Sequence, residues 1–75
     1  MAVTAHQLAV LASFGRTGSY KLSAGELGIR RGTVRATLVR VRCHYGTATT
    51  VQALMAAIVA GDLDPRTVVP VDRPA

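Results

Sequence analysis

The chain has few of the residues from which a catalytic, metal or disulfide-linked site is built. It contains one cysteine, Cys43, which excludes an internal disulfide and cannot form a zinc site alone. Its four acidic residues are scattered through the sequence, and no glycine-rich phosphate loop or zinc-ligand spacing occurs. They are Glu26, Asp62, Asp64 and Asp72. We therefore expect a protein that is not an enzyme and that has no cofactor and no metal.

Long apolar runs are also missing. No apolar segment reaches the length of a bilayer-spanning helix, and the first residues lack the basic start and apolar block of a signal peptide. The expectation is a soluble, cytoplasmic protein with no membrane partner. A chain of 75 residues makes one domain that buries only about 60% of its unfolded surface, so a dimer would add to a modest stability.

Positive charge is plentiful and locally concentrated. The formal net charge is +5 and the isoelectric point is near 10.8, which favours a polyanionic partner, nucleic acid before acidic membrane. Residues 30–42 hold five arginines and no acid. At helical spacing Val34, Leu38, Val41 and Tyr45 form one apolar stripe, with arginines on the other side. A surface helix normally interleaves acids with bases, so the counter-charges of this helix are expected in another molecule.

Local signals predict four helices. Thr4 and Gln7 form a capping box for a helix from Ala5 to Phe14, with Gly15 as its stop and Leu8, Leu11, Ala12 and Phe14 on its buried stripe. Ser19 caps a second helix from Tyr20 to Leu27 that ends at Gly28. Ile29 is then expected to enter the core and lead directly into the arginine helix, about 31–44. Two short helices joined by such a turn make a helix-turn-helix, whose second helix enters the major groove of DNA.

The fourth helix is predicted from Thr50 to Ala60, with a second capping box and Gly61 as its stop. Its inward face is expected to hold Val51, Leu54, Met55 and Ile58. A second face of small residues permits close approach of another helix, so we predict a dimer contact at Ala53, Ala56, Ala57 and Ala60. Residues 1–63 are thus expected to form the domain, and the proline-containing residues 64–75 an extended tail.

The order and spacing of these blocks resemble the four-helix DNA-binding domain of the LuxR/GerE class of bacterial transcription regulators. The resemblance covers residues 3–63 and rests on short blocks in a shared order. They are Val3-Thr4, Val10-Leu11, Gly18-Ser19-Tyr20-Lys21, Leu27-Gly28-Ile29, Thr33-Val34-Arg35 and the start of the last helix, Val51 to Ala53. It implies an all-α, helix-turn-helix fold, docking of helix three in the major groove, dimerisation through helix four and an operator with two half-sites. The chain would then be a small stand-alone regulator of bacterial or phage type, associated with the nucleoid.

Carried over position by position, the resemblance places Arg35, Ala36 and Val39 against base edges and Thr33 at a phosphate. Arginine suits bidentate bonding to guanine, whereas alanine and valine suit contact with a thymine methyl group. Lys21, Arg30, Arg31 and Arg40 are interpreted as further phosphate contacts. The chain departs from the family at Arg42, where an aliphatic core residue is usual, so this side chain is expected to turn outward or to serve an interface.

Two other functions remain open from the sequence. The basic face is also compatible with a protein-interaction module that docks on RNA polymerase or another regulator, and with nonspecific coating of DNA. The adjacent Cys43 and His44 point about 100 degrees apart on a helix and lack a third ligand or an orienting acid, so we expect a surface or interface role for them.

Overall fold

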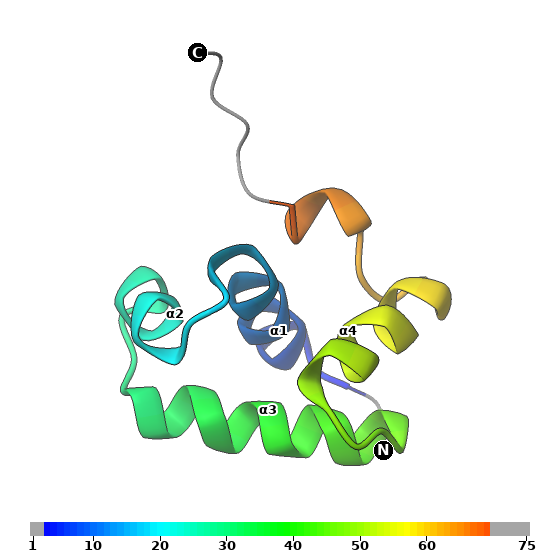
Figure 1. Cartoon of the computed structure of the whole chain (residues 1–75), viewed down its shortest axis with the longest axis horizontal. Helices are drawn as coiled ribbons and strands as arrows, with labels where there is room; N and C mark the ends of the chain where they lie inside the picture. Colours follow the sequence, from blue (N-terminus) through cyan, green and yellow to red (C-terminus); the bar gives the residue numbers. More distant parts are fainter. Residues whose placement is uncertain (1–2, 70–75) are drawn as a thin grey trace.

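The computed structural model describes residues 3–69, which fold into four α-helices and one short 3-10 helix without any strand. The elements are α1 (Ala5–Thr17), α2 (Tyr20–Leu27), α3 (Arg31–Tyr45), α4 (Thr50–Val59) and η1 (Pro65–Thr67). Helix α3 runs along one side of the molecule, with α2 packed near its start and α4 near its end, while α1 lies between them (Figure 1). The prediction of an all-α fold with four helices is confirmed.

Side-chain caps begin three of the four α-helices, as the sequence predicted. Thr4 with Gln7 and Thr49 with Gln52 form complete capping boxes, and the Ser19 side chain accepts a hydrogen bond from the amide of Leu22. Each cap satisfies an amide that the helix itself leaves without a partner. Helix α2 has the predicted bounds, and α3 extends one residue further, to Tyr45.

The predicted end of α1 is wrong, because the helix continues past Gly15 to Thr17. The left-handed C-cap is Gly18, with φ of 68°, and its amide donates to the carbonyl of Phe14. Gly15 has a packing role instead. A Cβ atom at this position would lie 3.0 Å from the Cβ of Val68, so the absent side chain allows the C-terminal segment to pack closely.

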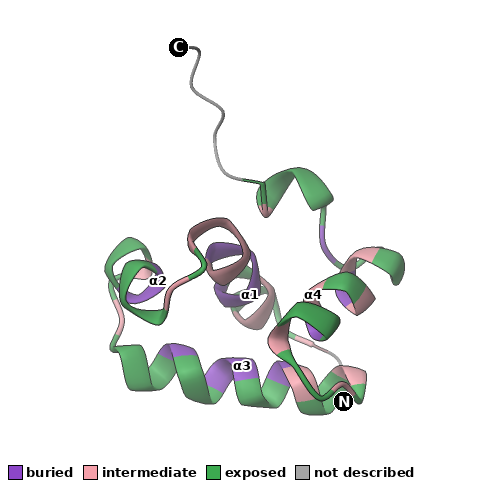
Figure 2. Cartoon of the chain, viewed as in Figure 1, coloured by how far each residue is buried: buried purple, intermediate pink, exposed green. Residues whose placement is uncertain are grey.

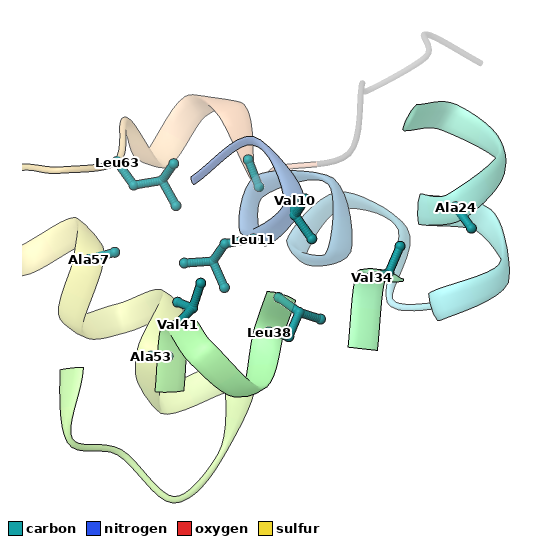
Figure 3. Close-up of a cluster of buried hydrophobic side chains, with 10 residues drawn as sticks. Val10, Leu11, Ala24, Val34, Leu38, Val41, Ala53, Ala57 and Leu63 are labelled. Atoms are coloured by element: carbon teal, nitrogen blue, oxygen red, sulfur yellow. The ribbon is translucent and has the colours of Figure 1, made fainter. Parts of the chain in front are cut away.

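One apolar core joins all four α-helices (Figure 3). The predicted stripe of α3 is confirmed at Val34, Leu38 and Val41, which are at most 1% exposed. The core of α1 is centred on Val10 and Leu11, and Val10 was not among the predicted stripe residues. Other predicted core residues are half-buried around this centre, and Leu27 joins them: Leu8, Phe14, Ile29, Tyr45, Leu54 and Ile58.

Helix α4 is turned differently from the prediction. Ala53 and Ala57 have no exposed surface and belong to the core, so they cannot contact a second copy. The expected inward residues Val51 and Met55 are instead 65% and 55% exposed, and Val59 is 84% exposed. Small side chains allow α4 to approach α1 and α3 closely, which explains why the alanines face inward. Of the remaining predicted dimer contacts, Ala56 is half-buried and Ala60 is exposed.

The prediction of an extended tail from residue 64 is wrong for residues 64–69. Leu63 is buried, the Asp64 side chain accepts from the amide of Arg66 to cap η1, and the carbonyl of Thr67 accepts a 2.7 Å hydrogen bond from Arg16. This segment folds back onto α1 on the side of the molecule away from α3 (Figure 1). Residues 70–75 of the predicted tail lie outside the described residues.

Candidate nucleic-acid interface

Helix α3 presents one buried and one exposed face (Figure 2). The buried face holds the apolar stripe and Thr37, whose hydroxyl donates to the carbonyl of Thr33 at 2.8 Å and so brings no unpaired polar group into the core. The exposed face carries every base-contact and phosphate-contact residue predicted on this helix. They are Arg31, Thr33, Arg35, Ala36, Val39 and Arg40. The structure therefore confirms the amphipathic division of α3 that the sequence predicted.

A tight turn joins α2 to α3. Gly28 has φ of 68°, in the left-handed region where glycine carries no steric penalty, and the amide of Ile29 donates to the carbonyl of Ala24. Ile29 is half-buried against the core, as predicted. Arg30 follows in extended backbone and, unlike the residues that begin the other α-helices, gives no side-chain hydrogen bond to cap α3. The two helices are thereby packed together with their first turns close to one surface.

Within residues 3–69, the acidic side chains all interact away from the exposed face of α3. Glu26 pairs with Arg16, and Asp64 pairs with Arg66. The carboxylate of Asp62 accepts a 2.8 Å hydrogen bond from the hydroxyl of Tyr45. No ion pair involves the exposed cations of α2 and α3 in this part of the chain, which are Lys21, Arg30, Arg31, Arg35 and Arg40. Their positive charge is therefore uncompensated within the described structure.

These interactions raise the pKa of Tyr45 and lower the pKa of Asp64. Burial, followed by the hydrogen bond and charge of Asp62, raises the pKa of Tyr45 to about 12. The hydrogen bond from the Arg66 side chain lowers the pKa of Asp64, and the same contact raises the pKa of Arg66. Both pairs stabilise connections around α4 and η1 and take no part in the exposed face of α3.

An open depression lies between the starts of α2 and α3. It has a volume of about 400 Å³ and gathers three cationic residues, Lys21, Arg31 and Arg35, at one place. Ser19, Tyr20 and Gly32 complete its lining. Tyr20 also packs on Phe14, with ring centroids 5.0 Å apart. Thus the structure brings Lys21 beside the α3 arginines, while Arg30, Val39 and Arg40 lie outside the depression.

Gly32, like Ser19 and Tyr20, lines the depression but was not predicted as a site residue. Glycine within a predicted helix usually signals only a weak helix, so its place beside three cations became visible only in the structure. Arg42 has a partner that the sequence did not indicate. It is half-buried, and its guanidinium donates a 3.4 Å hydrogen bond to the carbonyl of Ala48, so it supports the loop between α3 and α4.

Cys43 and His44 are exposed near the end of α3. The described part of the chain contains no group of three potential metal ligands. The ring of His44 instead meets the ring of Tyr45 edge-on, with centroids 4.7 Å apart. Among residues 3–69, no helix is both long enough and apolar enough to cross a membrane.

Comparison with known proteins gave no match to a family model, a curated protein or a solved structure.

Proposed function

We propose that this protein is a sequence-specific double-stranded DNA-binding protein, a transcription regulator of the LuxR/GerE type that inserts α3 into the major groove. The observation that carries the proposal is the uncompensated positive charge on the exposed sides of α2 and α3. A phosphodiester backbone supplies matching negative charge at close, regular spacing. The major groove of DNA admits an α-helix, and the 15 residues of α3 are long enough to lie across it.

Sequence reading is assigned to the middle of the exposed face. Arg35 can donate two hydrogen bonds to the O6 and N7 atoms of guanine, which discriminates against a wrong base by about 1–3 kcal/mol. Ala36 follows Arg35 directly and Val39 lies one helical turn further, so both can contact thymine methyl groups. Val39 is 41% exposed although it is apolar, which is consistent with a partner that covers it.

Phosphate contacts are assigned to the residues that surround this reading surface. They are Lys21, Arg30, Arg31, Thr33 and Arg40, all of them exposed. Such contacts fix the position and register of the protein on the duplex but carry no sequence information. They make affinity depend on salt, because each neutralised phosphate releases counterions.

A homodimer through α4 is part of this proposal, with a different contact surface from the predicted alanines. Val51, Met55 and Val59 are spaced four residues apart, so they form one exposed apolar stripe along the helix. Burying this stripe against its copy in a second chain would remove apolar surface from water and place two α3 helices on two half-sites. Sedimentation of wild type and Met55→Lys tests this contact, and a wild-type chain that stays monomeric with and without DNA would exclude it.

The proposed function is tested by selecting bound fragments from random duplex DNA and measuring affinity for the selected and a scrambled duplex at two salt concentrations. A motif with two related half-sites, bound more tightly than the scrambled duplex at both concentrations, is the expected result. Weak binding that ignores sequence and collapses with salt, at a logarithmic slope near −0.9 per phosphate contact, would leave only electrostatic attraction.

Two variants separate base reading from phosphate binding. Arg35→Ala is expected to lower affinity for the selected duplex and to relax one base position, because it removes a base contact. Lys21→Ala is expected to weaken binding to both duplexes and to reduce the salt slope. Equal losses on both duplexes for both variants would contradict the assignment of Arg35.

A further inference from the structure

Among the described residues, nothing packs against the position that a side chain of Gly32 would take. Gly32 lies in the first turn of α3 with an ordinary helical backbone, and a Cβ atom built on it would meet nothing within 4 Å. Glycine is the poorest helix former after proline, so another residue would suit the helix better. Gly15 differs, since Val68 and Leu54 occupy the space of its missing side chain.

Gly32 lies on a surface that is open to a ligand. It lines the depression between α2 and α3 together with the cationic residues Lys21, Arg31 and Arg35. Position 32 lines this volume and has open space where a Cβ would lie, so we infer that a large side chain there would take up part of the depression. The depression is therefore open toward solvent and lined by positive charge, and Gly32 adds no side chain to it.

We propose that this depression seats one backbone phosphate of the bound DNA and that Gly32 keeps the seat open. The proposal rests on the proposed function and adds a defined anchor to it. A phosphodiester group is a compact anion with accepting oxygens, which matches the donors of Lys21 and Arg31. Arg35 lines the same depression, so a phosphate held there would set the position of α3 relative to the base that Arg35 reads.

Gly25 provides a matched control. It lies within α2, is exposed, has no atom within 4 Å of an added Cβ, and does not line the depression. We expect Gly32→Leu to lower affinity for the selected duplex by about tenfold or more, the effect of losing one or more hydrogen bonds to a charged group. Gly25→Leu should bind as wild type does. Thermal unfolding of both variants shows whether they fold, and leucine favours a helix over glycine at either position.

The phosphate itself is located by replacing single phosphates of the selected duplex with neutral methylphosphonates. We expect one phosphate in each half-site whose replacement weakens wild-type binding about tenfold but weakens Gly32→Leu binding much less, because that variant has already lost the contact. Equal losses for both proteins at every phosphate would overturn the proposal, as would wild-type affinity in Gly32→Leu or an equal loss in Gly25→Leu.

Other outcomes distinguish failure of the phosphate site from failure of the proposed function, or identify a different ligand. If the wild-type chain binds no duplex, the proposed function and the phosphate seat both fail. If it binds duplex but Gly32→Leu binds equally well, only the seat fails. Titration with inorganic phosphate, followed through the amide resonances of Gly32 and Gly25, separates the sources of the anion. If free phosphate shifts the Gly32 amide resonance in a saturable way and the protein binds no duplex, the depression is assigned to a small phosphorylated ligand instead of DNA.

Discussion

Replacing Ser13 by alanine should stabilise this protein. Ser13 lies in α1 with no exposed surface, and its hydroxyl oxygen has no hydrogen-bond partner among the described residues. Ser23 in α2 is equally buried, but its hydroxyl lies 2.8 Å from the hydroxyl of Thr17. The two serines therefore differ in hydrogen bonding and not in burial.

The expected gain has two parts. An unsatisfied buried hydroxyl costs about 1–3 kcal/mol of desolvation, and alanine improves helix propensity by up to about 0.7 kcal/mol. Removing one oxygen atom loses some packing, so we expect a net gain of about 1–2 kcal/mol. In a domain of this size that gain corresponds to a rise of about 4–16 °C in the melting temperature.

Urea and thermal unfolding of wild type, Ser13→Ala and Ser23→Ala measure the effect. Ser23→Ala has the same propensity gain but removes a hydrogen bond worth about 0.5–1.5 kcal/mol, so its stability should equal or fall below that of wild type. A Ser13→Ala protein no more stable than Ser23→Ala would refute the reasoning. It would show that the Ser13 hydroxyl has a partner, such as a buried water molecule, that stabilises it.

Two further substitutions test the C-terminal half of the domain. Gly15→Ala should loosen the packing of η1 against α1, because its Cβ would lie 3.0 Å from that of Val68. We expect a net loss of up to about 2 kcal/mol and faster hydrogen exchange at the Val68 amide. Both effects should be smaller in a Val68→Gly background, which removes the Val68 Cβ and leaves only the 3.2 Å contact with Leu54. Tyr45 should make the folded state less stable as pH rises from about 10 through about 12, because its pKa is raised on folding and the unfolded chain releases the proton first. Tyr45→Phe should remove that part of the pH dependence in unfolding titrations, whereas an unchanged profile would show that neither burial nor the contact with Asp62 raises the pKa of Tyr45 in solution.

Helix beginnings could be predicted from the sequence because their determinants are local. The Thr4 and Thr49 capping boxes each lie within four residues, and both form as predicted. Helix ends were less certain where two glycines compete. Gly15 and Gly18 both follow the apolar stripe of α1, but only Gly18 takes the left-handed conformation that ends the helix, while Gly15 packs against Val68, which is distant in sequence.

The orientation of α4 could not be predicted from its own residues. Its apolar residues surround the helix, so periodicity does not identify an inward face. The choice depends on how much space α1 and α3 leave, and the small side chains of Ala53 and Ala57 fit that space. Large residues such as Met55 consequently face outward, against the usual preference for burying them.

The exposed face of α3 was predictable because its evidence is a pattern of charge and not of packing. Arg31 and Arg35 lie four residues apart on one helix, and like charges at this spacing destabilise a helix by about 0.2–0.5 kcal/mol per pair. The same chain places acids beside Arg16 and Arg66, which are outside this face. Repulsion between the arginines of α3 therefore lowers the stability of the free protein, whereas Arg16 and Arg66 are each paired with a carboxylate. A polyanion that binds this face would relieve the repulsion, which is why the charge distribution favours a DNA partner over a merely solvated surface.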